Sequence, residues 1–424
     1  MDPFYALDLA EDTIRVKPDL SPEELVPYLS TVDPGSKALC IHGYTDEDAD
    51  GTEDWKFIDV VTPHLSRLQN VQMLQLDDIS WGNLSPTARA FILTHFRSVT
   101  ALKLNGVDMW NSNQLLRVLD AFPSLSALVL DRVDADLCNH ATAQVTRITP
   151  LHLEYLQIGS LGWSRPLCEW LLGHRAVNLS IDQAMLTWAA TPEAKPDMVV
   201  GFIWRLAFRV KALAFDWCIP SKSFAARYAS SLLGSVSDTD SRSMPVDHTD
   251  RQVPENSLED DVEEPDKEVL KKRWLKVNEP SWSGSYRGAV EYASQPLQSK
   301  IEDLDAFVIW NNDIVDLFLL RFLCQLVNPG TTVFRVMIAV KNWQHFETID
   351  WPALDALFDG IPDFGIPAQT RNYTILLSGP WEDNGVAAGK LTSKLPNVVQ
   401  HGLFTFEGDN DPTRWARREY YESL

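Results

Sequence analysis

One short segment of the chain carries acidic residues at the spacing of a calcium-binding loop. Asp46, Asp48 and Asp50 alternate and Gly51 follows, as in the first half of an EF-hand loop, where carboxylate oxygens coordinate Ca²⁺. The twelfth position of such a loop should be a bidentate Glu, but here it is Phe57. Because that ligand is missing, we interpret the segment as an acidic loop and predict no metal and no cofactor.

A second segment resembles a phosphate-binding loop. Gly385 and Gly389 precede a lysine, but they are one residue closer together than the nucleotide-binding motif requires. Leu391 also replaces the Ser or Thr that would hold magnesium. Hydrolase, zinc-protease and dinucleotide motifs are absent from the sequence, so we predict no catalytic residues and no enzymatic activity. An enzyme or nucleotide-binding protein built around residues 375–392 remains the alternative hypothesis.

Apart from these two segments, polar residues recur along the chain at the ends of short apolar segments. If these segments are neighbouring parallel strands, their aspartates form an acidic stripe on one face, suited to a basic peptide or protein. Asp is also favoured where a strand gives way to a turn, and this second interpretation stays open. His42 is expected on the same face as a simple surface contact. The predicted partner-binding residues are Asp77, Asp131, Asp182, Asp216, Gln75, Lys103, Tyr155 and Gln157.

The elements that must position these side chains follow from an internal repeat. The motif apolar-x-x-apolar-x-apolar-x-x-apolar occurs four times, and its second apolar residue is Leu74, Leu102, Leu128 or Leu156. The near-constant interval between these positions, about 28 residues, is typical of leucine-rich repeats. Weaker copies surround Leu39–Ile41, Leu179–Ile181 and Leu213–Phe215.

Between the strand motifs the apolar spacing becomes helical. Ser85 and Pro86 are placed to begin a helix, and residues 113–122 put apolar side chains on one helix face. Stacked units of this kind bury their strands and helices together. The sequence therefore predicts an α/β leucine-rich-repeat solenoid, shaped as a horseshoe. Its parallel strands line the concave face, and its helices lie on the convex face.

The second half repeats the scheme less regularly. Phe307, Val336, Ile375 and Phe404 mark its strands, and the interval from Val336 to Ile375 is longer than the two beside it, so one unit carries an insertion. The predicted organisation is an N-terminal helical cap or remnant (1–36), leucine-rich repeats (37–234), a disordered acidic insertion (235–268), and irregular repeats with a C-terminal cap (269–424). Two independent repeat domains are the structural alternative.

Charge and composition limit the partners. The chain has 37 basic and 59 acidic residues, a formal net charge of −22, which disfavours nucleic acid and anionic membranes as partners. Residues 235–268 hold 12 acidic and 3 basic residues, and they have too little apolar surface to fold. The five cysteines are scattered, and no signal peptide or membrane span is evident. We expect a cytoplasmic or nuclear protein.

The four strong repeats and their spacers resemble the leucine-rich-repeat region of fungal, basidiomycete-type, F-box-like proteins. The resemblance is carried by Leu65–Leu76, Leu84–Arg89, Phe96–Val99 and Ala121–Leu130. It implies a protein-interaction module that serves as a substrate-recognition subunit or adaptor in cullin–RING ubiquitination. The family's F-box would bind a Skp-type adaptor.

Two features depart from that family. The residues before Leu39 contain no complete F-box, and Leu20–Val26 is expected to form a helix instead. The ninth motif position is apolar (Ile79, Val107, Val133, Leu161) where many leucine-rich repeats place an Asn. The turns of this chain must therefore close in a different way.

Overall fold

The computed structural model is a mixed α/β fold built on one open, all-parallel sheet of twelve strands. It describes residues 13–17, 22–31, 33, 35–43, 55–109, 111–135, 152–159, 171, 180–189, 196–218, 299–310, 313–361, 364 and 370–410. The expected acidic loop at 46–51 and the expected acidic insertion at 235–268 lie outside them. Among the described residues, no helix has the length and apolar character needed to cross a bilayer.

The strands of the main sheet follow one another in chain order, so each pairs with its nearest sequence neighbours. They are β1 (Ile14–Val16), β2 (Ala38–His42), β3 (Met73–Asp77), β4 (Ala101–Asn105), β6 (Ala127–Asp131), β8 (His152–Ile158), β9 (Ser180–Ala189), β10 (Val210–Cys218), β11 (Asp303–Ile309), β12 (Val333–Ala339), β13 (Asn372–Ser378) and β14 (Thr405–Asp409). A second, two-stranded parallel sheet joins β5 (Asp108–Met109) to β7 (Asp134–Ala135).

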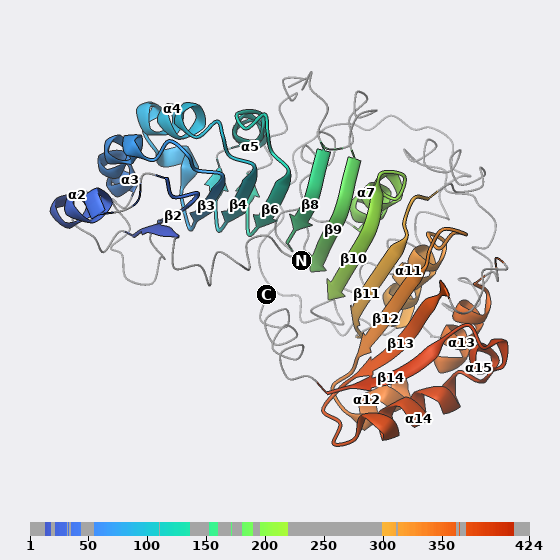
Figure 1. Ribbon diagram of the computed structural model, residues 1–424. Coiled ribbons are helices and arrows are strands. Elements are labelled where there is room, and N and C mark those ends of the chain that lie inside the picture. Colours follow the sequence, from blue (N-terminus) through green and yellow to red (C-terminus); the bar gives the residue numbers. More distant parts are fainter. Residues whose placement is uncertain are drawn as a thin grey trace, which may run out of the picture.

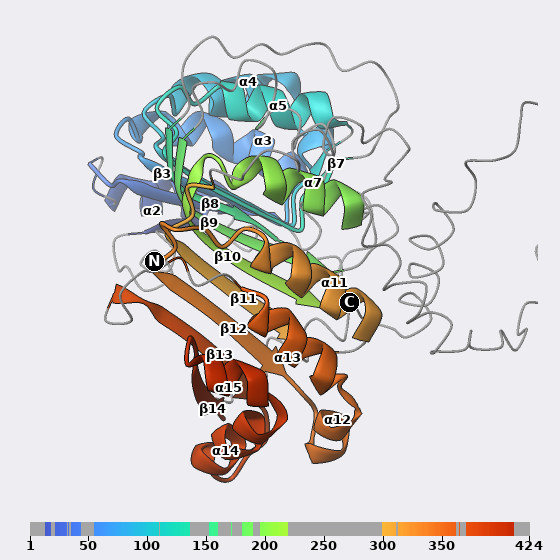
Figure 2. The ribbon, with the colours of Figure 1, turned by 90° about the vertical axis from the view of Figure 1, so that its right-hand side faces the viewer.

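The helices lie on the outer side of the curved sheet, and the strands line its inner side (Figure 1). In the view turned by 90°, α7, α11 and α13 lie in front of the strands (Figure 2). The α-helices are α2 (Pro22–Thr31), α3 (Trp55–Val61), α4 (Pro86–His95), α5 (Ser112–Asp120), α7 (Pro196–Leu206), α11 (Asp313–Cys324), α12 (Trp343–Thr348), α13 (Trp351–Asp359), α14 (Asn384–Lys394) and α15 (Pro396–His401). Two 3₁₀ helices lie in the early units: η1 (Thr62–Arg67) follows α3 and precedes β3, and η2 (Trp81–Asn83) joins β3 to α4.

The hydrophobic core fills the space between the sheet and the helices. Leu74, Leu76, Leu102 and Leu104 are fully buried on the helix-facing side of their strands, together with Ile92 of α4. Burying a side chain of this size contributes about 1.5–3 kcal/mol, so the repeated apolar positions account for the sheet's register. The α4 helix begins as expected, because Ser85 Oγ accepts a hydrogen bond of 3.1 Å from Ala88 N.

The turns after β3, β4 and β6 close through a residue with left-handed backbone. Asp78 (φ 51°), Gly106 (φ 63°) and Arg132 (φ 48°) occupy the eighth motif position. Asp78 N and Gly106 N donate to the carbonyls of Asn105 and Asp131, which end the next strand along the sheet. This arrangement leaves the ninth position free to be apolar and buried, which explains the missing Asn of the repeat motif.

Two expectations from the sequence need correction. Residues 1–36 contain more than a helical cap, because β1 pairs with β2 and adds a strand to the sheet before α2. Two independent repeat domains are also ruled out for the sheet, because β10 pairs with β11 from Ala212↔Asp303 to Cys218↔Ile309. The inserted length between β12 and β13 holds the extra short helix α12 before α13, as the longer spacing indicated.

Candidate functional site on the inner face of the sheet

The inner face of the sheet is the face opposite the helices, and strand register arranges its side chains in rows. Row five, the fifth motif position, runs without a break along the described strands: Arg15, Cys40, Gln75, Lys103, Val129, Gln157, Met185, Ala214, Asp305, Arg335, Thr374 and Thr405. Row seven has two runs: His42, Asp77, Asn105 and Asp131, then Thr187, Asp216, Phe307, Met337, Leu376 and Glu407.

Asp77 is the centre of a polar cluster near the amino-terminal end of row seven. Its side chain accepts hydrogen bonds from Gln75 Nε2 at 2.6 Å and from Asn105 Nδ2 at 3.2 Å. Cys40 Sγ lies 3.4 Å from Asp77 Oδ2, and His42 Nε2 also lies 3.4 Å from that oxygen. Asp77 is buried to 3% exposure, so these neighbours replace the water that its carboxylate would otherwise bind.

His42 belongs to this cluster without completing a hydrogen bond there. Its Nε2 is buried and faces the Asp77 carboxylate, but it has no hydrogen-bond partner of good geometry. The rest of the side chain is partly open to solvent, with 28% of its surface exposed. His42 is therefore more than the simple surface contact that the sequence indicated.

Asp131, also predicted, lies two strands further along the same row. Burial raises the pKa of the Asp131 carboxyl, and the charges of Arg132 and Lys103 lower it in part. Lys103 is half-buried in row five of the intervening strand, as expected. Arg132 reaches back over the turns, and its Nη2 donates to Asn105 Oδ1 at 3.0 Å and to Asp78 Oδ1 at 3.3 Å.

Tyr155 and Gln157, both predicted, lie together on β8. The Tyr155 hydroxyl donates to Gln157 Oε1 at 2.9 Å and approaches Met185 Sδ at 3.8 Å. Asp216 takes its predicted place in row seven of β10, paired with Thr187, and is 6% exposed. The structure thus brings Asp77 and Gln75 into one cluster and spreads Lys103, Asp131, Tyr155, Gln157 and Asp216 along the same face.

Asp182 is the exception, because the register predicted for its repeat is wrong. Ile181 pairs with Leu153 and Val210, which makes it the first apolar position of the unit and not the sixth. Asp182 therefore lies at the amino end of β9, one residue before the inner-face position of Gln183. Its carboxylate accepts a 2.7 Å hydrogen bond from Lys211 Nζ, which lowers its pKa, and it lies 3.7 Å from His152. It does not belong to the stripe.

The inner face carries an excess of acidic side chains in its described part. The basic side chains on its strands are Arg15, Lys103 and Arg335, and the last forms a two-pronged ion pair with Asp305. Its acidic residues are Asp77, Asp131, Asp216, Asp303, Asp305, Glu407 and Asp409. Of these, Asp303 and Glu407 are exposed. Exposed carboxylates of this kind can attract a cationic partner over distances of about a Debye length.

The Cys40–His42–Asp77 arrangement lacks the geometry of nucleophilic catalysis. In a catalytic pair the histidine nitrogen accepts a hydrogen bond from the thiol. Here the thiol and the histidine nitrogen both contact the Asp77 carboxylate instead. Burial and the neighbouring Asp77 raise the pKa of the Cys40 thiol, so the reactive thiolate is disfavoured. The cluster therefore has no activated nucleophile, and its sulfur, nitrogen and oxygen atoms are of types that can ligate a metal ion.

Sequence reasoning did not identify Cys40 as a site residue or connect it to His42. The signal was present as a Cys-x-His pair on one strand, which places both side chains on the same face. Its partner Asp77 could be found only by knowing how β2 aligns with β3. No protein-family model matches the chain, and a search of curated proteins finds no relative.

The phosphate-loop-like segment forms a helix. Residues 385–392 lie within α14, and Asp383 Oδ1 accepts hydrogen bonds from the backbone NH groups of Gly385 at 2.7 Å and Val386 at 3.4 Å. These amides are the donors that a phosphate would need. The segment therefore has a capped helix start in place of a phosphate cradle.

Proposed function

We propose that this chain is a non-enzymatic leucine-rich-repeat solenoid that binds a basic protein partner on its inner face. The observation that carries the proposal is the continuous inner face with its acidic excess, which is exposed at Asp303 and Glu407. Protein partners need a broad surface of roughly 800 Å² on each side, and an extended parallel sheet whose described helices all lie on the opposite face offers one. Exposed Asp303 and Glu407 supply charge that a partner reaches without rearrangement.

The resemblance to F-box-like proteins gives this binding module a cellular role. We propose that the chain acts as a substrate-recognition subunit, or as an adaptor, in cullin–RING ubiquitination in the cytoplasm or nucleus. Support comes from the repeat sequence and from the sequential parallel strands, and both suit a substrate-holding surface. Fold alone does not fix function, so the ligase role needs its own test.

The test is affinity purification of the full-length tagged chain from its own cells, with identification of the proteins that co-purify. A Skp-type adaptor and a cullin among them would support the ligase role. Stable partners without these proteins would remove the ligase role and keep the binding module. Recovery of no partner would overturn the proposal.

Two matched variants connect any partner to the inner face. Asp303→Asn combined with Glu407→Gln neutralises two exposed inner-face carboxylates, and Glu23→Gln combined with Glu347→Gln removes two exposed carboxylates from helices. We expect the inner-face pair to weaken partner binding about tenfold at low salt and the helix pair to leave it unchanged. Equal binding by both variants would contradict the inner face as the docking surface.

A further inference from the structure

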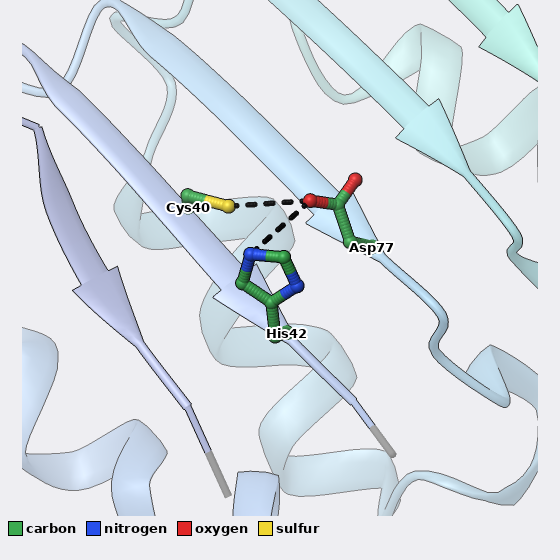
Figure 3. Close-up of side chains that lie close together, drawn as sticks. All are labelled: Cys40, His42 and Asp77. Carbon is green, nitrogen blue, oxygen red and sulfur yellow. Dashed lines mark hydrogen bonds and ion pairs between the residues drawn. The ribbon is translucent and has the colours of Figure 1, made fainter. Parts of the chain in front are cut away.

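Cys40, His42 and Asp77 bring a sulfur, a nitrogen and an oxygen together near the amino-terminal end of the inner face. One donor atom from each lies within 4.8 Å of the other two. Cys40 and His42 point from β2 towards the Asp77 carboxylate on β3 (Figure 3). Strand register fixes this arrangement, because His42 pairs directly with Asp77 and Cys40 lies two residues earlier on the same face.

Two of the three distances between the donor atoms match those around a tetrahedral zinc ion. Zinc bonds of about 2.3 Å to sulfur and about 2.1 Å to nitrogen and oxygen imply ligand separations of about 3.6 Å (S to O) and about 3.4 Å (N to O). The observed separations from Asp77 Oδ2 are 3.4 Å to Cys40 Sγ and 3.4 Å to His42 Nε2. The third separation, from the Cys40 sulfur to the His42 nitrogen, is at most 4.8 Å against about 3.6 Å around zinc, so any adjustment falls on these two side chains.

The carboxylate is held in place by residues that would not themselves bind the ion. Gln75 Nε2 donates to Asp77 Oδ2 and Asn105 Nδ2 donates to Asp77 Oδ1. Hydrogen bonds of this kind orient metal ligands and raise their affinity. Cys40 is 2% exposed and Asp77 is 3% exposed, so both ligands are held with little freedom.

The donor set selects the class of metal. A thiolate and an imidazole disfavour Ca²⁺ and Mg²⁺, which take oxygen ligands. A sulfur, a nitrogen and an oxygen from three side chains suit Zn²⁺ with a fourth position left open. His42 is the most exposed of the three ligands, with 28% of its side chain open to solvent, so solvent reaches the site on the side of this ring. A water molecule, or a side chain of a docked partner, can complete the tetrahedron there.

We propose that Cys40, His42 and Asp77 form a three-ligand zinc site at the amino-terminal end of the inner face. Binding transfers the thiol proton of Cys40 to solvent and replaces its hydrogen bond to Asp77 by two metal bonds, one to each residue. Two cationic side chains, Arg15 and Lys103, also act on Cys40 and would oppose the ion. The competing interpretation is a hydrogen-bonded polar cluster that binds no metal.

The test uses the full-length chain, purified under reducing conditions and freed of metal with a chelator. Titration with Co²⁺ reports thiolate ligation by a charge-transfer absorption band and tetrahedral geometry by intense visible bands. Zn²⁺ is then added in competition. Wild-type protein should bind one equivalent of Co²⁺ with both signatures, and Zn²⁺ should displace it.

Matched cysteine variants assign the site. Cys40→Ala should abolish the charge-transfer band and weaken Co²⁺ binding by more than about 100-fold, because it removes a direct ligand. Cys324→Ala, which removes the buried thiol of α11, should leave both unchanged. Absence of stoichiometric binding by the wild type, or full binding by Cys40→Ala, would overturn the proposal.

A second variant guards against a folding defect at the buried position of Cys40. His42→Ala changes a partly exposed side chain, and circular dichroism checks that it folds. It should lose more than about 100-fold in Co²⁺ affinity, and unchanged affinity would again overturn the site. This experiment needs no partner protein, so its failure would leave the proposed function of the inner face untouched.

Discussion

The sheet packs only aliphatic side chains against the helices at β3, β4 and β6, whereas β12 and β13 add the aromatic side chains of Phe334 and Tyr373, and Phe404 lies just before β14. In the first region, Leu102, Leu104 and Leu128 are examples of the buried aliphatic side chains. In the second, Phe334 lies edge-on to Tyr373 at a ring-centroid distance of 5.9 Å, and Phe404 contacts Phe358 at 5.6 Å. The first region keeps a near-constant repeat spacing, whereas the second accepts an extra helix.

The aromatic packing explains how the second region tolerates its irregular length. The inserted helix α12 is fixed by Trp343, which lies against Trp381 at 3.9 Å between centroids, and by Phe346, which lies against Trp351 at 4.6 Å. Large rings bury more area per residue than leucine, and their stacked and edge-on contacts fix the position of the added helix. The comparison teaches that a repeat unit can vary in length, without interrupting the pairing of its strands, when large side chains fill the core around the added residues.

The inner faces of the two regions differ as well. Near β2 and β3 the side chains form a buried polar cluster around Asp77. Near β11 to β13, row seven becomes apolar with Phe307, Met337 and Leu376, and row five holds the exposed Asp305–Arg335 ion pair. One backbone frame therefore presents two surfaces of different chemistry.

The largest expected effect is on the aromatic core. Phe334→Ala should lower the free energy of unfolding by about 4 kcal/mol, against about 3 kcal/mol for Leu104→Ala, because it leaves the larger cavity. Guanidinium unfolding measures both. Hydrogen exchange should show the Phe334 loss concentrated in β11–β14, since repeats contact mainly their neighbours. Equal acceleration of exchange in β2–β4 would break the division into two regions.

A matched pair of glycines compares the turns of the first region with the helices of the second. Gly106 has φ 63°, and a Cβ there would lie 2.1 Å from Asp78 Oδ1, so Gly106→Ala should cost about 1–2 kcal/mol. Gly389 lies in α14 with open space around it, so Gly389→Ala should add about 0.5–1 kcal/mol of stability. Denaturation midpoints that move in the same direction would contradict the turn geometry.

The ion pair of the second region should contribute little. Asp305 and Arg335 have side chains 37% and 51% exposed, so solvent screens their attraction. A double-mutant cycle with Asp305→Asn and Arg335→Gln should give a coupling energy of at most about 1 kcal/mol, and it should fall in high salt. A larger, salt-independent value would show that this part of the inner face is less accessible than we describe.

The smallest effect is a difference in titration between Asp131 and Asp182, which the sequence treats as equivalent. Burial raises the pKa of Asp131, so the folded chain binds the carboxyl proton of this residue more tightly than the unfolded chain does. The stability that this binding contributes is lost as pH rises. The hydrogen bond from Lys211 lowers the pKa of Asp182, whose contribution is lost as pH falls. Carboxyl NMR titration should find Asp131 protonating at the higher pH, and the reverse order would contradict the register of β9.

Much of the fold could be predicted because burial fixes the apolar positions. Leu74 and Leu76 must face the helices, and this fixes Gln75 and Asp77 on the opposite face. The prediction failed at Asp182 because Ala184, a small residue, holds the fourth motif position, while Ile181 matched a different place in the pattern. A small core residue carries too weak an apolar signal to fix register.

The metal-binding geometry could not be predicted for a different reason. The unit that separates β2 from β3 is longer than the regular units that follow it. Because this first unit does not keep the regular spacing, the sequence does not predict how the two strands align. The observed strand pairing places His42 opposite Asp77 and Cys40 two residues earlier on the same face. Sequence patterns report what each strand buries, but chemistry between strands depends on how they are aligned.

The continuous pairing of β10 with β11 has a kinetic consequence. Neighbouring strands elsewhere in the sheet form after closing loops of roughly one repeat length, but Ala212 must meet Asp303 across a far longer stretch of chain. Loop-closure entropy makes this encounter about 1 kcal/mol more costly than the others. We therefore expect the strands on either side to assemble rapidly from local contacts, and the joining of β10 to β11 to set the overall folding rate.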